Sequence, residues 1–348
     1  MRTKLIVYLL IALFLVGCSN NHDRKEISPP KLTEDSNSNN PTDIRLMLHE
    51  IDYPLDGIQN NHIALYYLPS GEDDEHKLEL VVDDHIVELP DDFLYWDIYA
   101  YASKPTIQII ENSNGNNYIA VYAGYASVGR TDSYYQVHLF TYKDNQIIEI
   151  WNDNELLLEN ENGRIYSTFD HHFVQINIPK YSLSETIHYE QYKPKDFIEY
   201  SKIVQLIVSD PKEAKKLLTD NHPFRTNRIE RFGIMDYDND GNDEMFFTQD
   251  IDYDPSRSYL TTLFLLVEPR GEHLTIKKAF TAPKNTIEGQ ILQQLISNGQ
   301  FDMSGPNDTL SFWLDHGDVT HDDVDEALSR MLKNDLIIKD NDLYFIKI

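Results

Sequence analysis

The loop at residues 236–244 constrains the fold of this chain more than any other stretch. Its acidic and turn-forming members are Asp236, Asp238, Asp240, Gly241, Asn242, Asp243 and Glu244. Largely apolar runs border it at 232–235 and 245–247. A hard cation needs several oxygens that converge on one point, and glycine adopts the positive φ that a sharp turn requires. The pattern therefore predicts two short strands joined by a turn that binds a metal ion.

The two alternatives to this metal-binding turn are an EF-hand and a solvated acidic turn. An EF-hand would place a bidentate Glu at the twelfth position of the loop. Counted from Asp236, that position is Phe247, and the flanking residues are strand-like, so the EF-hand is excluded. The other alternative is a solvated acidic turn that holds no metal, and the sequence leaves it open.

Short apolar runs separated by turn signals fill residues 44–285. Aromatic residues make up 11% of the chain, and 22 residues are Tyr, which favours strands over helix bundles. Turn-forming residues interrupt the runs at 112–117 and at 143–146, among other places. Regular short strands of this kind are typical of a β-sandwich or a β-propeller. The sequence therefore predicts a mainly β body, interrupted by one helical pattern at 201–219.

Two segments of this body, 105–151 and 232–280, share one internal order: strand, loop, strand, bend, long strand, turn, strand. Four strands in about 40–50 residues is the size of one propeller blade. The second segment resembles an FG-GAP or VCBS-type repeat, the calcium-loop blade of integrin-like β-propellers, in its alternating aspartates, glycine, late acid and apolar run. The first segment has the strand order without the acids. Two or three such units are fewer than a closed propeller needs, so a partial or degenerate propeller is expected, with a β-sandwich as the alternative.

The resemblance implies a structural Ca²⁺ ion in the loop. By the pattern of the repeat, the ligands would be the side chains of Asp236, Asp238, Asp240 and Glu244 and the backbone carbonyl of Asn242. Such a set nearly fills a calcium shell and leaves little open coordination for a substrate. The ion is therefore expected to stabilise the repeat, not to catalyse a reaction.

Residues 1–18 have the pattern of an export signal, in which two basic residues precede an apolar core at 5–16. That core is too short for a comfortable membrane span. The segment ends in Leu15, Val16, Gly17 and Cys18. This ending resembles the lipobox of bacterial lipoproteins, and Cys18 is the only cysteine in the chain. The resemblance implies cleavage after Gly17 and a lipid anchor on Cys18; an ordinary signal with a chance cysteine is the alternative.

Residues 19–43 are polar and punctuated by prolines, which predicts a disordered tether between the anchor and the folded body. The formal net charge is −28, from 30 basic and 58 acidic residues. Such a charge repels nucleic acid, which is therefore not expected as a partner. The Asn-, Lys- and Ile-rich composition is typical of a Gram-positive bacterium. We expect a protein attached to the cell membrane through its lipid and facing the extracytoplasmic side.

Residues 286–348 change to a helical pattern. Apolar positions at 287–296 have helical spacing, and Gly299 follows as a helix end. Thr320 with Asp323 three residues later predicts the start of a helix with one apolar stripe.

A short apolar piece lies between these helices at 310–314, and the chain finishes in an expected hairpin at 336–346. Three helices followed by a hairpin resemble a winged-helix unit in order. Acidic side chains at the start of its last helix oppose DNA binding. This small α+β unit is therefore predicted to serve packing or protein interaction.

Candidates for catalysis are few. His171 and His172 beside Asp170 are the best candidates for a catalytic metal, but neighbouring side chains of a strand point to opposite faces, so the two imidazoles cannot bind one ion together. The sequence contains no nucleophile elbow, zinc-helix motif or phosphate loop. Tyrosine-rich strands offer a face for a sugar or peptide, although cross-strand packing is the favoured interpretation. These tyrosines are Tyr95, Tyr99, Tyr101, Tyr122, Tyr125, Tyr134 and Tyr135.

Two functions follow as hypotheses. The first is a surface-tethered, calcium-stabilised β-repeat lipoprotein that binds a protein or polysaccharide, or acts as a scaffold, without catalysis. The second is an exported hydrolase of cell-wall or extracellular polymer, which would need an acid, a base and a nucleophile that the sequence does not reveal. The sequence favours the first.

Overall fold

The computed structural model describes part of the chain, and the described residues are 45–68, 77–89, 103–126, 133–156, 166–170, 173–188, 210, 212–213, 224–253, 258–284 and 286–347. Several predicted features lie outside them: the signal with Cys18, the tether, the pair His171 and His172, and most of the helical pattern at 201–219. No helix in the described ranges is both long and apolar enough to span a membrane.

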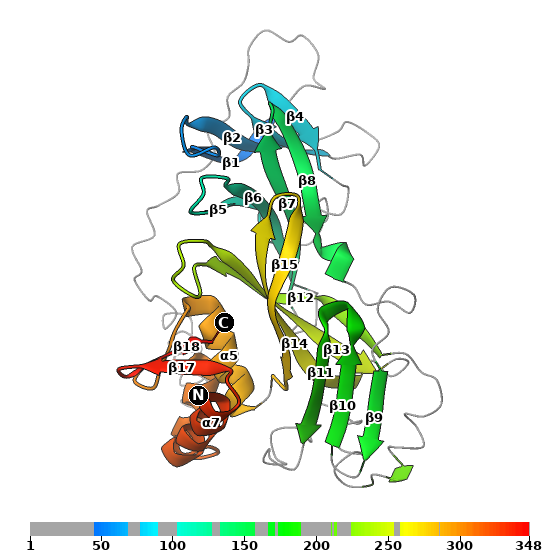
Figure 1. Ribbon diagram of the computed structural model, residues 1–348, viewed down its shortest axis with the longest axis vertical. Helices are drawn as coiled ribbons and strands as arrows, with labels where there is room; N and C mark the ends of the chain where they lie inside the picture. The colour runs from blue at the N-terminus through cyan, green and yellow to red at the C-terminus, as the bar shows by residue number, and fades with distance from the viewer. Residues whose placement is uncertain are drawn as a thin grey trace, which may run out of the picture.

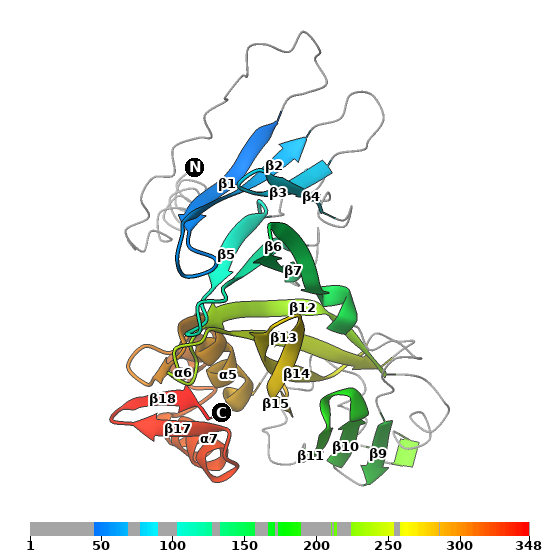
Figure 2. The same ribbon diagram turned by 45° about the horizontal axis from the view of Figure 1, so that its top comes forward.

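The described residues are mainly β, as predicted, and their strands pair antiparallel throughout (Figure 1). The first sheet contains four strands in sequence order: β1 (Leu46–Tyr53), β2 (Asn61–Leu68), β3 (Lys77–Val82) and β4 (His85–Glu88). Buried residues of this sheet form one hydrophobic core with residues of the next sheet along the chain, such as Ile119 and Phe140. The first sheet therefore packs on the second through side chains, and Figure 2 shows the two sheets next to each other.

The second sheet consists of two four-stranded meanders. The first meander contains β5 (Thr106–Ile110), β6 (Tyr118–Ala126), β7 (Ser133–Lys143) and β8 (Gln146–Asn152). The second contains β12 (Phe224–Met235), β13 (Glu244–Tyr253), β14 (Ser258–Arg270) and β15 (His273–Ala282). Both have the strand order that the sequence predicts for the two repeated segments. They join into one eight-stranded sheet where Ile229 of β12 pairs with Tyr135 of β7.

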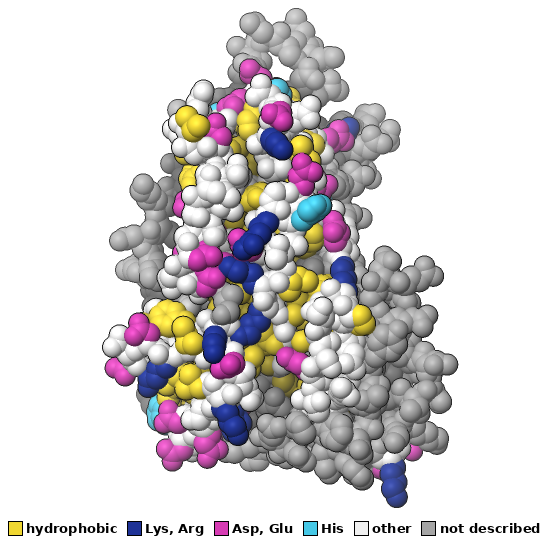
Figure 3. Space-filling view, viewed as in Figure 1, with side chains coloured by type: hydrophobic (Ala, Val, Ile, Leu, Met, Phe, Trp, Pro, Cys, Tyr) yellow, Lys and Arg dark blue, Asp and Glu magenta, His cyan; other side chains and the backbone are white. Residues whose placement is uncertain are grey.

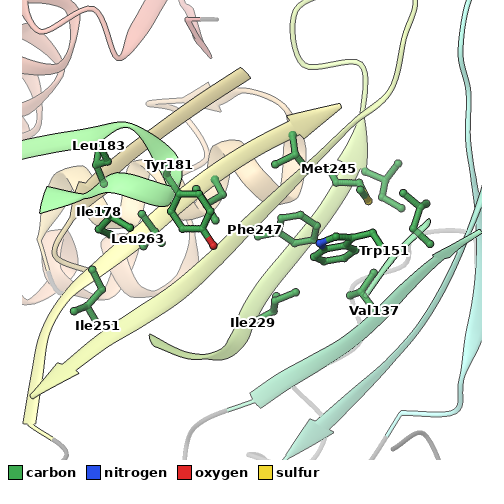
Figure 4. Close-up of a cluster of buried hydrophobic side chains, with 14 of the residues drawn as sticks. Val137, Trp151, Ile178, Tyr181, Leu183, Ile229, Met245, Phe247, Ile251 and Leu263 are labelled. Carbon is green, nitrogen blue, oxygen red and sulfur yellow. The ribbon is translucent and has the colours of Figure 1, made fainter. Parts of the chain in front are cut away.

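A three-stranded sheet covers one face of this large sheet. Its strands are β9 (Tyr166–Asp170), β10 (Phe173–Ile178) and β11 (Leu183–His188). Side chains of β10 and β11, such as Ile178 and Leu183, share a core with β13 and β14 (Figure 4). At the other end of the same core, Trp151 packs against Phe247 with ring centroids 5.3 Å apart. This core spans both meanders and holds them together.

The C-terminal unit combines three helices with a small sheet. Its elements are α5 (Ile287–Asn298), β16 (Phe301–Asp302), α6 (Asp308–His316), α7 (His321–Lys333), β17 (Ile337–Asp340) and β18 (Leu343–Ile346). The predicted caps are confirmed: Gly299 ends α5 in the left-handed region with φ 71°, and Thr320 forms a full capping box with Asp323 at α7. The predicted hairpin forms as β17 and β18. The short strand β16 was not predicted, and it pairs with β18 to give the order β16-β18-β17.

The C-terminal unit packs on the opposite face of the second meander from β9–β11, as Figures 1 and 2 both show. Phe246, Phe264 and Phe280 project from β13, β14 and β15 into a core that they share with α5, α6 and α7. The rings of Phe264 and Phe280 stack with centroids 5.1 Å apart. Helix α5 and the sheet thus form one hydrophobic unit, and the loop at 236–243 lies at its edge.

Candidate metal loop

The acidic loop forms the predicted turn between β12 and β13. The Asp236 carboxylate accepts hydrogen bonds from the backbone N–H groups of Asp240 and Gly241, each at 3.0 Å. Asn239 and Gly241 both have positive φ, at 59° and 86°. Asn tolerates the left-handed region better than most residues, and Gly adopts it without strain. The local sequence therefore fixes the turn.

Three of the five predicted ligands come together. Asp236, Asp238 and Glu244 each offer a carboxylate oxygen, and these oxygens all lie within 4.8 Å of one another. Glu244 is fully buried at the first position of β13, whereas the two aspartates are half-buried. Convergent carboxylate oxygens are the donors that Ca²⁺ prefers, so the donor chemistry fits a hard cation.

The other two predicted ligands are Asp240, through its carboxylate, and Asn242, through its backbone carbonyl. The Asp240 carboxylate is exposed and accepts hydrogen bonds from the backbone and side-chain nitrogens of Asn242, at 2.9 and 2.8 Å. The Asn242 side-chain oxygen accepts from the backbone N–H and the hydroxyl of Ser113, at 2.9 and 2.8 Å. Asp240 does not belong to the convergent triad of Asp236, Asp238 and Glu244, although its Oδ2 lies 3.4 Å from the ammonium of Lys277.

Sequence reasoning missed Lys277, which projects from β15 into the acidic cluster. Its Nζ lies 2.8 Å from Asp238 Oδ2, 2.9 Å from Glu244 Oε1 and 3.3 Å from Glu268 Oε2. The β14–β15 ladder skips one residue between Ile276 and Lys278, so Lys277 is the extra residue of a β-bulge. Bulges re-aim side chains next to functional sites. The Lys277-Lys278 pair in the sequence does not indicate which lysine turns inward, because the bulge breaks the alternation of the strand.

The charges of this cluster do not balance. Burial, together with the nearby carboxylate of Asp238, raises the pKa of Glu244 to about 7, even though Lys277 and the Tyr237 N–H lower it. Burial opposes the charge of Lys277, but hydrogen bonds to Asp238 and Glu244 outweigh it and raise the pKa of its ammonium. A single lysine therefore stays charged among several acids, and the buried carboxylate still lacks full compensation.

The loop is also bonded to the corresponding loop of the first meander, at 111–117. The Glu111 N–H donates to the Asp243 carboxylate at 2.9 Å, and the Asp243 N–H donates to the Glu111 carbonyl at 2.8 Å. The Tyr53 hydroxyl at the end of β1 donates to the Glu111 carboxylate at 2.7 Å. The acidic loop of the second meander thus contacts the corresponding loop of the first, which in turn contacts the first sheet.

Tyr237 fastens the same loop to the C-terminal unit. Its buried hydroxyl donates to the Ile296 carbonyl in the last turn of α5 at 2.6 Å, and its ring packs edge-on against Phe246. Burial raises the pKa of this hydroxyl, which stays protonated and can donate. The loop therefore connects three parts of the molecule: the first meander, β15 and α5.

A second lysine lies among acids at the other end of the same sheet face. Lys284 Nζ contacts both oxygens of Glu230, at 2.9 and 3.1 Å, and Asp250 Oδ2 at 2.5 Å. Glu230 is the extra residue of another β-bulge, between Ile229 and Arg231 of β12. Burial raises the pKa of Asp250 well above its usual value. Figure 3 shows Lys and Arg side chains along the middle of the visible face, beside acidic side chains, although the chain as a whole is strongly acidic.

The tyrosines proposed as a binding face are only partly described. Tyr95, Tyr99 and Tyr101 lie outside the described residues. Tyr122 and Tyr135 both pack against Phe232, with ring centroids 5.2 and 6.3 Å apart. These two side chains therefore serve packing between the meanders, in agreement with the favoured interpretation.

The chain matches no protein-family model, no curated protein and no solved structure in searches of all three.

Proposed function

We propose that this protein is a membrane-anchored extracytoplasmic lipoprotein whose β-repeat body binds a protein or polysaccharide, or serves as a scaffold, and is stabilised by calcium in the loop at 236–244. The observation that carries the calcium assignment is the convergence of three carboxylate oxygens from Asp236, Asp238 and Glu244. Its consequence for the molecule follows from the position of the loop. An ion there would stiffen the junction between the first meander, β15 and α5.

Calcium titration tests the calcium assignment directly. Extracellular modules bind calcium with dissociation constants of about 10⁻⁴–10⁻³ M, and we expect this range here. At a free calcium concentration about ten times the dissociation constant, the free energy of unfolding should rise by about 1.4 kcal/mol. Isothermal titration calorimetry and thermal unfolding with calcium or EDTA measure the two quantities.

Matched variants separate a specific site from general charge screening. Asp236→Asn removes one charge from the triad and should abolish both the binding and the calcium-induced rise in melting temperature. Asp144→Asn makes the same charge change in the exposed β7–β8 turn, where Asn accepts the positive φ, and should leave both unchanged. If the wild type binds no calcium at millimolar concentration, or if both variants respond alike, the calcium assignment is wrong.

The lipid anchor is tested at Cys18. In a Gram-positive host, the wild-type protein should fractionate with membranes and incorporate a radiolabelled fatty acid, because two or more acyl chains hold a protein firmly at a bilayer. Cys18→Ser removes the only sulfur that can be acylated and should release the protein from the membrane fraction without label. A labelled or membrane-bound Cys18→Ser protein would contradict the anchor.

A further inference from the structure

Lys277 holds a position that a metal loop of this type does not require. Its ammonium lies within 2.8–3.4 Å of carboxylate oxygens from four residues on three different segments. These residues are Asp238, Asp240, Glu244 and Glu268. The side chain is only 13% exposed, so the attraction is weakly screened by solvent. The lysine thus draws the loop, the start of β13 and the end of β14 toward one point.

Two of its four partners, Asp238 and Glu244, are also members of the convergent triad. A cation in the loop would need oxygens of the same side chains that the ammonium already engages. Like charges this close repel, and a divalent ion would carry twice the charge of the lysine. The lysine and a bound cation therefore oppose each other, whereas each alone neutralises part of the same acidic cluster.

The backbone places Lys277 there specifically. The β-bulge of β15 turns this residue inward, while the neighbouring Lys278 donates from the same strand to the backbone carbonyls of Asp335 and Lys347 in the C-terminal unit. The Glu268 oxygen that lies 3.3 Å from Lys277 Nζ also accepts a hydrogen bond from Arg270 at 2.8 Å. The lysine is therefore fixed by the strand, not drawn in from a flexible surface.

We propose that Lys277 is a built-in counter-cation of the acidic loop: it keeps the loop closed without a metal, and a divalent cation binds there only in competition with its ammonium. This proposal rests on the calcium site of the proposed function and specifies what sets its affinity. It makes Lys277 a residue that determines cation affinity, and it makes the loop stable over a wide range of calcium concentration.

The test compares Lys277→Met, which keeps the aliphatic stem and removes the charge, with Lys143→Met on the exposed β7–β8 hairpin. In EDTA, Lys277→Met should melt at a lower temperature than the wild type. Its dissociation constant for calcium should be at least about tenfold lower, because a like charge has been removed from beside the site. The calcium-induced rise in its melting temperature should exceed that of the wild type. Lys143→Met should match the wild type in all three measurements.

The outcomes separate this proposal from the calcium assignment. If wild type and Lys277→Met bind calcium equally well, the competition is refuted and the calcium site stands. If only Lys277→Met binds calcium, the competition is supported, but the calcium assignment for the wild type falls and the lysine alone closes the native loop. If neither binds, both proposals fall. Lys277→Gln, purified in calcium, gives the same comparison should the Met variant fail to fold in EDTA.

Discussion

Lys284→Met should lower the free energy of unfolding by about 3–5 kcal/mol, because it leaves a buried acid without its counter-charge. Lys284 contacts Asp250 and Glu230 and lies over the ring of Tyr259 at 5.1 Å. The Asp250 carboxylate is buried, and its other oxygen accepts from the Thr262 hydroxyl at 2.8 Å. Met fills a volume similar to that of the lysine stem, so the loss of unfolding free energy reflects the missing charge and not a cavity.

Urea unfolding of the wild type and Lys284→Met measures this loss, with the exposed Lys143→Met as the control that should change little. The loss should also depend on pH. The folded-state pKa of Asp250 lies above its unfolded value, so the folded protein binds its proton more tightly. The deficit is then largest at high pH and shrinks as the pH falls through the folded pKa. A second change, Asp250→Asn, added to Lys284→Met should recover part of the lost stability.

A cost below about 1 kcal/mol at neutral pH would contradict this account, since that is the range of exposed ion pairs. It would mean that Asp250 avoids a buried charge in the variant, either by contact with water or by taking up a proton. A deficit that grows as the pH falls would contradict the sign of the pKa shift.

Gly233→Ala is expected to lower the free energy of unfolding by about 3 kcal/mol through overpacking. A Cβ at this position would lie 2.5 Å from the Ile296 carbonyl oxygen and 2.5 Å from the Tyr237 hydroxyl. These two atoms form the hydrogen bond that fastens the acidic loop to α5. Ala therefore cannot be accommodated without separating α5 from β12 or breaking that bond.

The matched control is Gly305→Ala, where a Cβ would meet no atom within 4 Å. Urea unfolding should show the loss for Gly233→Ala only. Hydrogen exchange should show the weakened protection in α5 and in the loop at 236–243, because these are the elements that the new methyl group pushes apart. Equal stability of the two variants would show that α5 does not pack as closely on β12 as the structure has it.

The sequence by itself determined the local features. Alternating aspartates with Asn239 and Gly241 specify a turn whose hydrogen bonds lie within a few residues. Gly299 and Thr320 end and begin helices for the same reason, since a cap is satisfied by its immediate neighbours. The order of strands in both meanders is equally local, because each hairpin joins adjacent segments.

Only the tertiary structure decided what surrounds the acidic loop. Its partners come from Glu111, Lys277 and Ile296, which lie far from it in sequence. Two β-bulges turn Lys277 and Glu230 toward lysine–acid clusters, and a bulge depends on the pairing of a whole ladder. No pattern in the sequence marks a lysine as the inward one of an adjacent pair.

The acidic loop shows this division most clearly. Its residues alone predict a turn with convergent carboxylates, and three of the five proposed ligands do converge. Packing then turned Asn242 toward Ser113, placed Tyr237 under α5, and brought a lysine into the acids. The turn follows from the chain's own backbone preferences, whereas its charge balance is set by segments that meet it only after the sheets have assembled.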